Sequence, residues 1–310
     1  MDLRPKGVLL SLAGFGRRRI AAWAALAVLV LGTGYFARAR VLEFADDLYP
    51  APAAMTGEAG TLFLVGGGDL PDSLGREFVE LAGGPNARLV IIPGAPINGP
   101  QRAAEIQTWR ALGVPNVAVL HAESRSQADD PDFSQVLATA TGVWLGGGQQ
   151  TWFTAWYRGT LVEDRLKEVL ERGGVIGGTS AGASAVTNVM VAGGKREPIE
   201  SRGFGLLDGV IVDQHFLRRN RTGRMLKLLS RHPDQIGLGI DEATAVVVDL
   251  KSGNIAVRGQ SYVLACVPDG DGVLQRLEVL KSGDYTSLAD LRGHSVEPVP
   301  ALVGDLILGD

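Results

Sequence analysis

The chain of 310 residues has little of what several classes of protein require. It contains one cysteine, Cys266, which excludes an internal disulfide and a structural zinc site built from several cysteines. Aromatic residues make up only 6% of the chain and charged residues 21%. With 45% hydrophobic residues and 42 glycines, the composition is typical of a globular α/β protein rather than a disordered, collagen-like or coiled-coil chain.

Basic residues are concentrated at the amino end of the chain. Residues 1–40 carry seven Lys or Arg against one acid, Asp2, although the whole chain has a net charge of −4. The rest of the chain is therefore acidic, and an acidic domain has no general electrostatic attraction for the phosphates of DNA or RNA. We expect no nucleic-acid partner.

An uncharged run, Ile20–Ala37, follows the three arginines Arg17–Arg19. As a helix this run spans about 27 Å, close to the thickness of the hydrocarbon core of a bilayer. The basic flank favours an amino terminus that stays inside. The run predicts an uncleaved transmembrane anchor or a removable signal peptide, cleaved near Ala37-Arg38-Ala39. In both cases we expect an exported main domain, periplasmic or extracellular, either membrane-anchored or secreted.

Three parts are expected along the chain. Residues 1–40 form the signal or anchor segment, residues 41–58 a linker rich in acids, proline and alanine, and residues 59–310 a globular domain. In that domain, short apolar runs alternate with helix-like stretches. The runs are Thr61–Val65, Arg88–Ile92, Asn116–Leu120, Gly142–Leu145, Gly174–Gly177 and Gly209–Val212, and the helix-like stretches include Leu74–Leu81, Gln101–Leu112, Leu161–Glu171 and Thr222–Arg231. This alternation predicts a three-layer α/β/α sandwich with a mostly parallel sheet, to which the strand-and-turn pattern after Asp249 adds C-terminal β-hairpins.

The segment Gly178-Thr179-Ser180-Ala181-Gly182 lies directly after one apolar run and opens a helix-like stretch, Ala181–Met190. This is the pattern of a nucleophile elbow, in which glycines leave room for a strained turn that lifts a serine hydroxyl above the sheet. We therefore predict Ser180 as a nucleophile and the Ala181 amide as the first oxyanion donor. The alternative is a packing turn, because small residues also occur where a helix packs tightly on a sheet.

A serine nucleophile needs a base, and the chain offers four histidines. His215 lies directly after the run Gly209–Val212, at the carboxyl end of a strand, where parallel sheets gather their ligands. His121 also follows an apolar run and is the competitor. His232 has the position of a helix cap, and His294 lies in a polar loop. We favour His215.

Asp241 and Glu242 follow the strand-like segment Gly237–Ile240, again at a carboxyl end. One of these carboxylates is a candidate for the third catalytic group, which orients the imidazole. The alternative is a solvated turn between two strands. The order serine, histidine, acid differs from that of ordinary α/β-hydrolases, which argues against a lipase or esterase. The glycines of Gly66–Asp69 lack the spacing of a dinucleotide site and predict a tight strand-to-helix turn.

Six blocks of the sequence resemble peptidase family S51, the cyanophycinase family. They are Leu64–Gly67, Ile91–Pro93, Gly146–Gln149, Gly178–Ser184, Asp213–Phe216 and Gly239–Glu242. The resemblance implies a fold similar to class I glutamine amidotransferases and a Ser-His-Glu triad on Ser180, His215 and Glu242. It also implies a serine-type peptidase, without cofactor or metal, that cleaves cyanophycin to β-Asp-Arg dipeptides. Cyanophycin is a polyaspartate with an arginine linked to each side-chain carboxyl.

The resemblance also implies a set of substrate-binding residues. These are Gln149, Asp213, Gln214, Arg219, Arg221 and Arg224. The charges support the three arginines independently, because they cluster at the start of a helix-like stretch, where cations oppose the helix dipole. A substrate that carries carboxylates supplies the missing counter-charge through bidentate pairs, and Asp213 pairs with a substrate guanidinium. The alternative is a solvated helix face.

In one block the chain departs from the family. The family commonly has Gly-Gly-Asp-Gln where this chain has Gly146-Gly147-Gly148-Gln149, and the Gly147 or Gly148 amide is expected as the second oxyanion donor. The export segment argues against intracellular storage and for digestion of polymer released by other cells. Two other functions stay open, an aspartyl dipeptidase-like enzyme (peptidase E) for short peptides and a catalytically inactive envelope binding module. A homodimer is a further expectation from the family.

Overall fold

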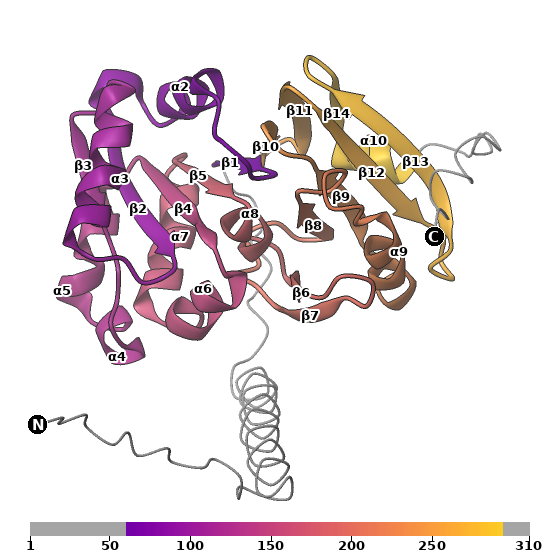
Figure 1. Ribbon diagram of the computed structural model, residues 1–310, viewed down its shortest axis with the longest axis horizontal. Coiled ribbons are helices and arrows are strands. Elements are labelled where there is room, and N and C mark those ends of the chain that lie inside the picture. Colours follow the sequence, from indigo (N-terminus) through magenta and orange to yellow (C-terminus); the bar gives the residue numbers. More distant parts are fainter. Residues whose placement is uncertain (1–59, 294–310) are drawn as a thin grey trace, which may run out of the picture. The chain divides into compact units, whose positions relative to one another are not determined.

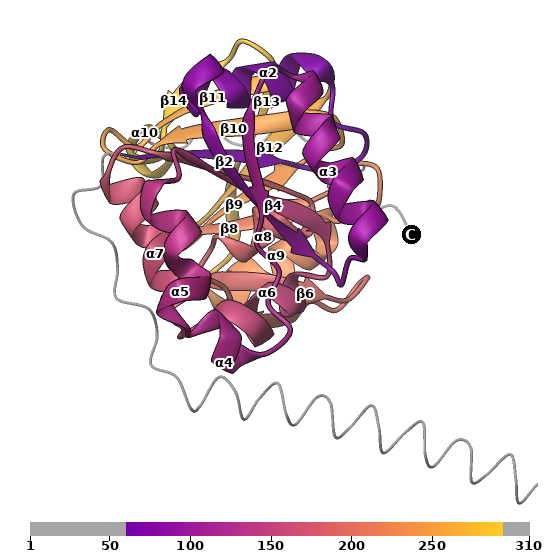
Figure 2. The same cartoon turned by 90° about the vertical axis from the view of Figure 1, so that its left-hand side faces the viewer.

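The computed structural model describes residues 60–293, which contain two large sheets (Figures 1 and 2). The predicted signal or anchor run, Ile20–Ala37, the linker and His294 lie outside these residues. Within the described part, none of the helices has the length and apolar character needed to span a membrane.

An eight-stranded sheet contains the strands predicted from the first apolar runs. Five neighbouring strands run parallel: β1 (Thr61–Val65), β5 (Val175–Thr179), β4 (Gly142–Gly148), β2 (Arg88–Gly94) and β3 (Asn116–Val119). On the other side of β1 the sheet continues antiparallel with β10 (Thr244–Asp249), β11 (Asn254–Gly259) and β14 (Tyr285–Ser287). An α/β fold with a large, mostly parallel sheet is therefore confirmed.

Helices cover both faces of the parallel strands, because the side chains of these strands are apolar on both faces. The helices here are α2 (Asp72–Leu81), α3 (Gly99–Ala111), α6 (Gln150–Tyr157), α7 (Leu161–Glu171) and α8 (Ala181–Ala185), with the short turns η1 (Gly84–Asn86), α4 (Arg125–Ala128), α5 (Pro131–Ser134) and η2 (Gln135–Thr139). On one face, Phe78 of α2 and Trp109 of α3 pack edge to face against Trp144. On the other face, Phe153 of α6 and Leu166 of α7 are fully buried.

A separate four-stranded sheet contains β13 (Leu274–Lys281), β12 (Tyr262–Pro268), β9 (Ile236–Ile240) and β8 (Val210–Gln214), in that order. Helix α9 (Thr222–Arg231) connects the parallel strands β8 and β9, and α10 (Leu288–Gly293) ends the described chain. The sequence placed the C-terminal hairpins on the main sheet, whereas hairpin β12–β13 pairs with β9. Apolar periodicity identifies a strand but not its partner, which explains this difference.

The helix predicted over Ala181–Met190 is shorter than expected, because α8 ends at Ala185. The Thr187 hydroxyl lies 3.0 Å from the Ser184 carbonyl oxygen and 2.9 Å from that of Val189, an alternative to helical hydrogen bonds. The chain then forms a hairpin of β6 (Val189–Gly193) and β7 (Ile199–Arg202). The helical prediction for residues 186–190 was therefore wrong.

The two large sheets meet where strands β1, β8 and β9 end. The chain crosses from β9 to β10, and so from one sheet to the other, through Asp241, Glu242 and Ala243. Gly66, directly after β1, donates to the Thr244 carbonyl at 2.9 Å and accepts from the His215 amide at 2.7 Å. These bonds bring the carboxyl ends of strands from both sheets together.

Candidate active site

Ser180 occupies a strained turn between β5 and α8. Its backbone has a φ of 51° and a ψ of −109°, a region that residues other than glycine rarely adopt. Its amide donates to the Val65 carbonyl of β1 at 3.0 Å. A Cβ added to Gly178 would lie 2.5 Å from the Gly182 backbone, and one added to Gly182 would lie 2.1 Å from the Leu145 carbonyl oxygen. The flanking glycines of the motif are therefore required by close backbone approach.

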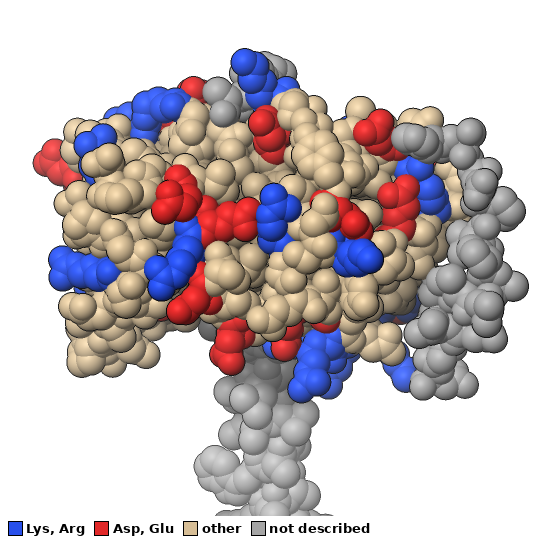
Figure 3. Space-filling view, turned by 90° about the horizontal axis from the view of Figure 1, so that it is seen from above, with Lys and Arg blue, Asp and Glu red and all other residues tan. Residues whose placement is uncertain are grey.

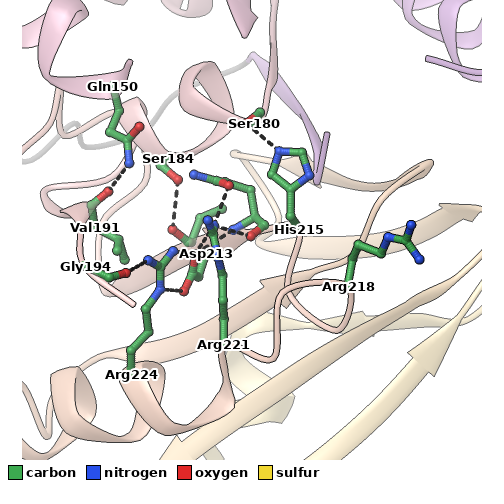
Figure 4. Close-up of polar contacts among 12 residues, drawn as sticks. Gln150, Ser180, Ser184, Val191, Gly194, Asp213, His215, Arg218, Arg221 and Arg224 are labelled. Carbon is green, nitrogen blue, oxygen red and sulfur yellow. Dashed lines mark hydrogen bonds and ion pairs between the residues drawn. The ribbon is translucent and has the colours of Figure 1, made fainter. Parts of the chain in front are cut away.

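His215 follows β8 and points at this serine. Its Nε2 atom lies 2.8 Å from Ser180 Oγ (Figure 4), and the residue is only 7% exposed. The competing candidate His121 instead lies parallel to the Trp152 ring, with the centroids 6.3 Å apart. His232 caps α9 and lies 2.6 Å from a Glu200 oxygen. Among the described histidines, His215 is thus the one hydrogen-bonded to Ser180.

Glu242 completes a chain of hydrogen bonds that begins at Ser180. Its Oε1 atom lies 2.6 Å from His215 Nδ1. A carboxylate only accepts, so Nδ1 carries the proton and Nε2 is left to accept from the serine hydroxyl. The adjacent Asp241 has other partners, since its carboxylate accepts from the Arg218 amide at 2.9 Å and the Ser261 hydroxyl at 2.8 Å.

The glycine turn after β1 lies against both histidine and glutamate, a role that the sequence did not reveal. A Cβ on Gly67 would lie 2.4 Å from His215 Cε1, and one on Gly68 would lie 3.0 Å from Glu242 Cβ. Both glycines have positive φ values, of 102° and 75°. The predicted strand-to-helix turn is present between β1 and α2, and it also leaves space for the imidazole. A run of glycines in one sequence carries no signal of what it lies against.

The surroundings of His215 lower the pKa of its imidazole below its usual value. Burial is the main cause, and the positive charges of Arg219 and Arg221 act in the same direction, whereas the hydrogen bond and charge of Glu242 raise the pKa. The ring is therefore neutral at neutral pH, which is the state that can accept a proton from Ser180.

Asp213 forms a buried ion-pair cluster beside the serine and histidine (Figure 4). Its carboxylate accepts two bonds from Arg224, from Nε at 2.6 Å and Nη2 at 2.5 Å, and one from Arg221 Nη1 at 3.1 Å. Arg224 is 2% exposed, and its Nη1 atom donates to the Gly194 carbonyl of the β6–β7 turn. The clustered charges of the sequence predict a substrate as the counter-charge of Arg224 and a substrate guanidinium as the partner of Asp213. The structure corrects this, because Asp213 supplies it and is itself fully buried.

The other predicted substrate-binding residues differ in their surroundings. Arg221 Nη1 donates to the backbone and side-chain oxygens of Gln214, both at 2.5 Å. Burial lowers the pKa of Arg221 to about 10, against the opposing charge of Asp213. Gln149 and Arg219 are exposed. Substrate binding by Gln149, Gln214, Arg219 and Arg221 stays a prediction.

Of the predicted oxyanion donors, Ala181 directly follows Ser180 and Gly147 lies near the residue before it. Ala181 is the buried first residue of α8, and its amide has no hydrogen-bond acceptor among the described residues. A Cβ on Gly147 would lie 3.9 Å from Thr179 Cγ2, so the end of β4 passes beside the residue before Ser180. Gly148 adopts a φ of 143° where β4 approaches Gly94 closely. Their function as oxyanion donors stays a prediction.

No metal centre is found within residues 60–293, since no group of three or more His, Cys, Asp or Glu there is placed to hold an ion. Cys266 is buried in β12, and burial raises the pKa of its thiol to about 12. On the face shown in Figure 3, acidic and basic side chains are interspersed.

Comparisons with known proteins identify the family to which the chain is similar. The family model described as Peptidase family S51 matches residues 62–255. The cyanophycinase of Geminocystis herdmanii is 34% identical over 198 residues, which cover 61% of this chain and 72% of that protein. The cyanophycinase of Synechococcus elongatus is 31% identical over 271 residues, covering 78% and 82%. The crystal structure of a peptidase from an acI-B1 Actinobacterium shares the fold, with a TM-score of 0.61 at 24% identity over 75% of this chain and 98% of that one.

Proposed function

This chain belongs to peptidase family S51 and is a serine-type peptidase, and from that premise we propose that Ser180, His215 and Glu242 are its catalytic triad. The observation that carries the proposal is the chain of two hydrogen bonds, 2.8 Å from serine to histidine and 2.6 Å from histidine to glutamate. The strained backbone of Ser180 supports it, because strain of this kind persists where the surroundings hold a nucleophile in place.

In the first half of the proposed reaction, Ser180 Oγ attacks the carbonyl carbon of the scissile peptide bond and its proton passes to His215 Nε2. Glu242 stabilises the resulting imidazolium through Nδ1. The oxygen of the tetrahedral intermediate takes up negative charge and accepts from the Ala181 amide and from the Gly147 or Gly148 amide. When the carbon–nitrogen bond breaks, His215 returns the proton to the leaving amine.

The second half releases the acyl group from Ser180. Water attacks the ester carbonyl, His215 takes one proton of that water, and the ester bond breaks with return of the proton to Ser180 Oγ. The products are a carboxylic acid, an amine and the unchanged enzyme. None of these proton transfers needs a base other than His215.

For the substrate we propose a cyanophycin-like polymer, cut at aspartyl peptide bonds to β-Asp-Arg dipeptides. Curated relatives at 31–34% identity carry the name cyanophycinase, which supports this choice. The guanidinium of Arg221, held by Gln214 beside His215, is suited to a carboxylate on such a polymer. The proposal includes export of the domain, as the sequence of residues 1–40 predicts.

The test compares purified wild type with Ser180→Ala on insoluble cyanophycin and on N-terminal aspartyl dipeptides. We expect wild type to release dipeptides from the polymer and the variant to lose turnover by a factor on the order of 10⁴ or more without a change in its melting temperature. A variant that keeps full activity disproves the nucleophile. A clear preference for free dipeptides indicates the dipeptidase alternative, and failure of a fluorophosphonate to label intact protein favours an inactive binding module.

A further inference from the structure

The segment that follows His215 is held rigidly by backbone hydrogen bonds. The amides of Arg219, Asn220 and Arg221 donate at 3.0 Å to the carbonyls of His215, Leu217 and Phe216 in turn. These bonds fix residues 216–221, between β8 and α9, relative to the imidazole.

A buried carboxylate fixes the middle of this segment. Asp241 is 8% exposed, and its Oδ1 atom accepts from the Arg218 amide at 2.9 Å. Its other oxygen accepts from the Ser261 hydroxyl at 2.8 Å, so both oxygens are occupied. Since Asp241 directly precedes Glu242, the backbone of Arg218 is tied to the residue beside the predicted catalytic acid.

The side chain of Arg218 differs from those of Arg221 and Arg224. Arg221 and Arg224 are paired with Asp213, whereas the exposed guanidinium of Arg218 has no ion pair or hydrogen bond within the described structure. Figure 4 shows Arg218 pointing away from Arg221 and Arg224, on the other side of His215. In this view the paired Arg221 and the free Arg218 therefore lie on opposite sides of the histidine, and Arg219, exposed next to Arg218, likewise has no side-chain partner in the described structure.

We propose that Arg218 is a second carboxylate-binding residue, which holds the substrate on the opposite side of the scissile bond from Arg221. The inference rests on the proposed function. In a cyanophycin-like polymer each arginine is linked through its amino group, so every repeat keeps a free carboxylate. Repeats on both sides of the cleaved bond thus carry a carboxylate, which an arginine guanidinium binds through two parallel hydrogen bonds. A dipeptide has no repeat to reach the second cation, so Arg218 favours polymer over short peptide.

The experiment compares Arg218→Ala and Arg218→Lys with Arg110→Ala as the matched control. Arg110 is an exposed arginine of α3 without a side-chain partner in the described structure. We expect Arg218→Ala to raise KM for solubilised cyanophycin about fivefold, the effect of one exposed charge pair, with a smaller change in kcat. Arg218→Lys should raise KM less than Arg218→Ala, because lysine keeps the positive charge but lacks the planar fork that binds a carboxylate. Arg110→Ala should behave as wild type.

A binding measurement separates this inference from catalysis. In the Ser180→Ala background, we expect Arg218→Ala to lower the fraction of enzyme that sediments with insoluble cyanophycin, and Arg110→Ala to leave it unchanged. Equal KM and equal sedimentation for the two alanine variants overturn the inference and leave the proposed function standing. A wild-type chain that neither cleaves nor binds cyanophycin overturns both.

Discussion

The two large sheets contribute different parts of the candidate triad. The eight-stranded sheet provides Ser180 through a local turn, in which two glycines and a strained φ fix the hydroxyl within a few residues of sequence. The four-stranded sheet provides His215 and Glu242 from the ends of two neighbouring strands. Their positions depend on contacts between segments far apart in the chain, such as the bond from the His215 amide to Gly66.

The comparison shows why a nucleophile is easier to recognise in a sequence than its partners. A strained turn leaves a short pattern of small residues, whereas packing between sheets leaves none. It also predicts that the histidine side is sensitive to changes in elements far from His215 in the sequence. Four variants test the histidine side.

The largest effect is expected when the acid of the four-stranded side loses its charge. Glu242→Gln should lower kcat by a factor on the order of 10⁴, because an amide no longer holds the imidazole in the tautomer that accepts from Ser180. Glu77→Gln is the matched control, since the side chain of Glu77, on α2, is 33% exposed like that of Glu242 and pairs with Arg258 of β11. Steady-state kinetics and melting curves check both variants. A loss below tenfold for Glu242→Gln contradicts its assigned role.

The next largest effect concerns the stability of the four-stranded side. Asp213→Asn leaves Arg224 buried without a counter-charge, which should lower the free energy of unfolding by about 3–5 kcal/mol. In the control Glu168→Gln, the partly exposed pairs with Arg165 and Arg172 on the helix surface are lost, and we expect at most about 1 kcal/mol. Denaturant unfolding measures both values. If they are equal, Asp213 does not hold this region together.

A smaller effect on activity is expected at the junction of the sheets. Gly67→Ala places a Cβ against the His215 ring and should lower kcat about 10²-fold, the effect of a misplaced catalytic group. Gly113→Ala provides the control, because Gly113 has a φ of 99°, close to the 102° of Gly67, and nothing lies within 4 Å of its added Cβ. Both variants carry the backbone strain, but only Gly67→Ala should lose turnover. Similar kcat values for the two would show that contact with the imidazole is unimportant.

The smallest expected change is a shift in pH dependence. Activity requires neutral His215, so kcat/KM should rise with pH through the lowered pKa of this residue and then level off. Arg219→Gln removes one of the charges that lower this pKa, so the acid limb should move to higher pH. Arg110→Gln should leave the limb in place. A shift of the limb to lower pH in Arg219→Gln would mean that the electrostatic effect of Arg219 has been assigned the wrong sign.

The sequence predicted much of the fold, because apolar runs mark buried strands. Strand β1 and helix α9 have the predicted bounds. The separate four-stranded sheet was not predicted, since β8 and β9 read like any other buried strands and pairing is a long-range property. The hairpin β6–β7 was missed because Val186–Met190 continued an apparently helical segment, although its β-branched residues favour a strand.

Within the site, Ser180 and His215 followed from motif and position, and their hydrogen bond is present. The choice between Asp241 and Glu242 stayed open until family resemblance was considered, because adjacent carboxylates in a turn are equivalent in sequence. The Asp213–Arg224 pair was interpreted as two groups that face a substrate. Only the fold reveals that two opposite charges eleven residues apart are buried against each other.

Glu242 lies in the short crossing by which the chain leaves β9 for β10. Because Ser180 follows a strand of the eight-stranded sheet and His215 and Glu242 follow strands of the four-stranded sheet, the hydrogen bond between Ser180 and His215 spans the joint between the two sheets. If one sheet shifts against the other by a fraction of an ångström, this bond lengthens while the backbone hydrogen bonds within each sheet stay intact. Turnover thus depends on the alignment of the two sheets. On warming, we expect activity to fall at a lower temperature than the circular dichroism signal of the secondary structure.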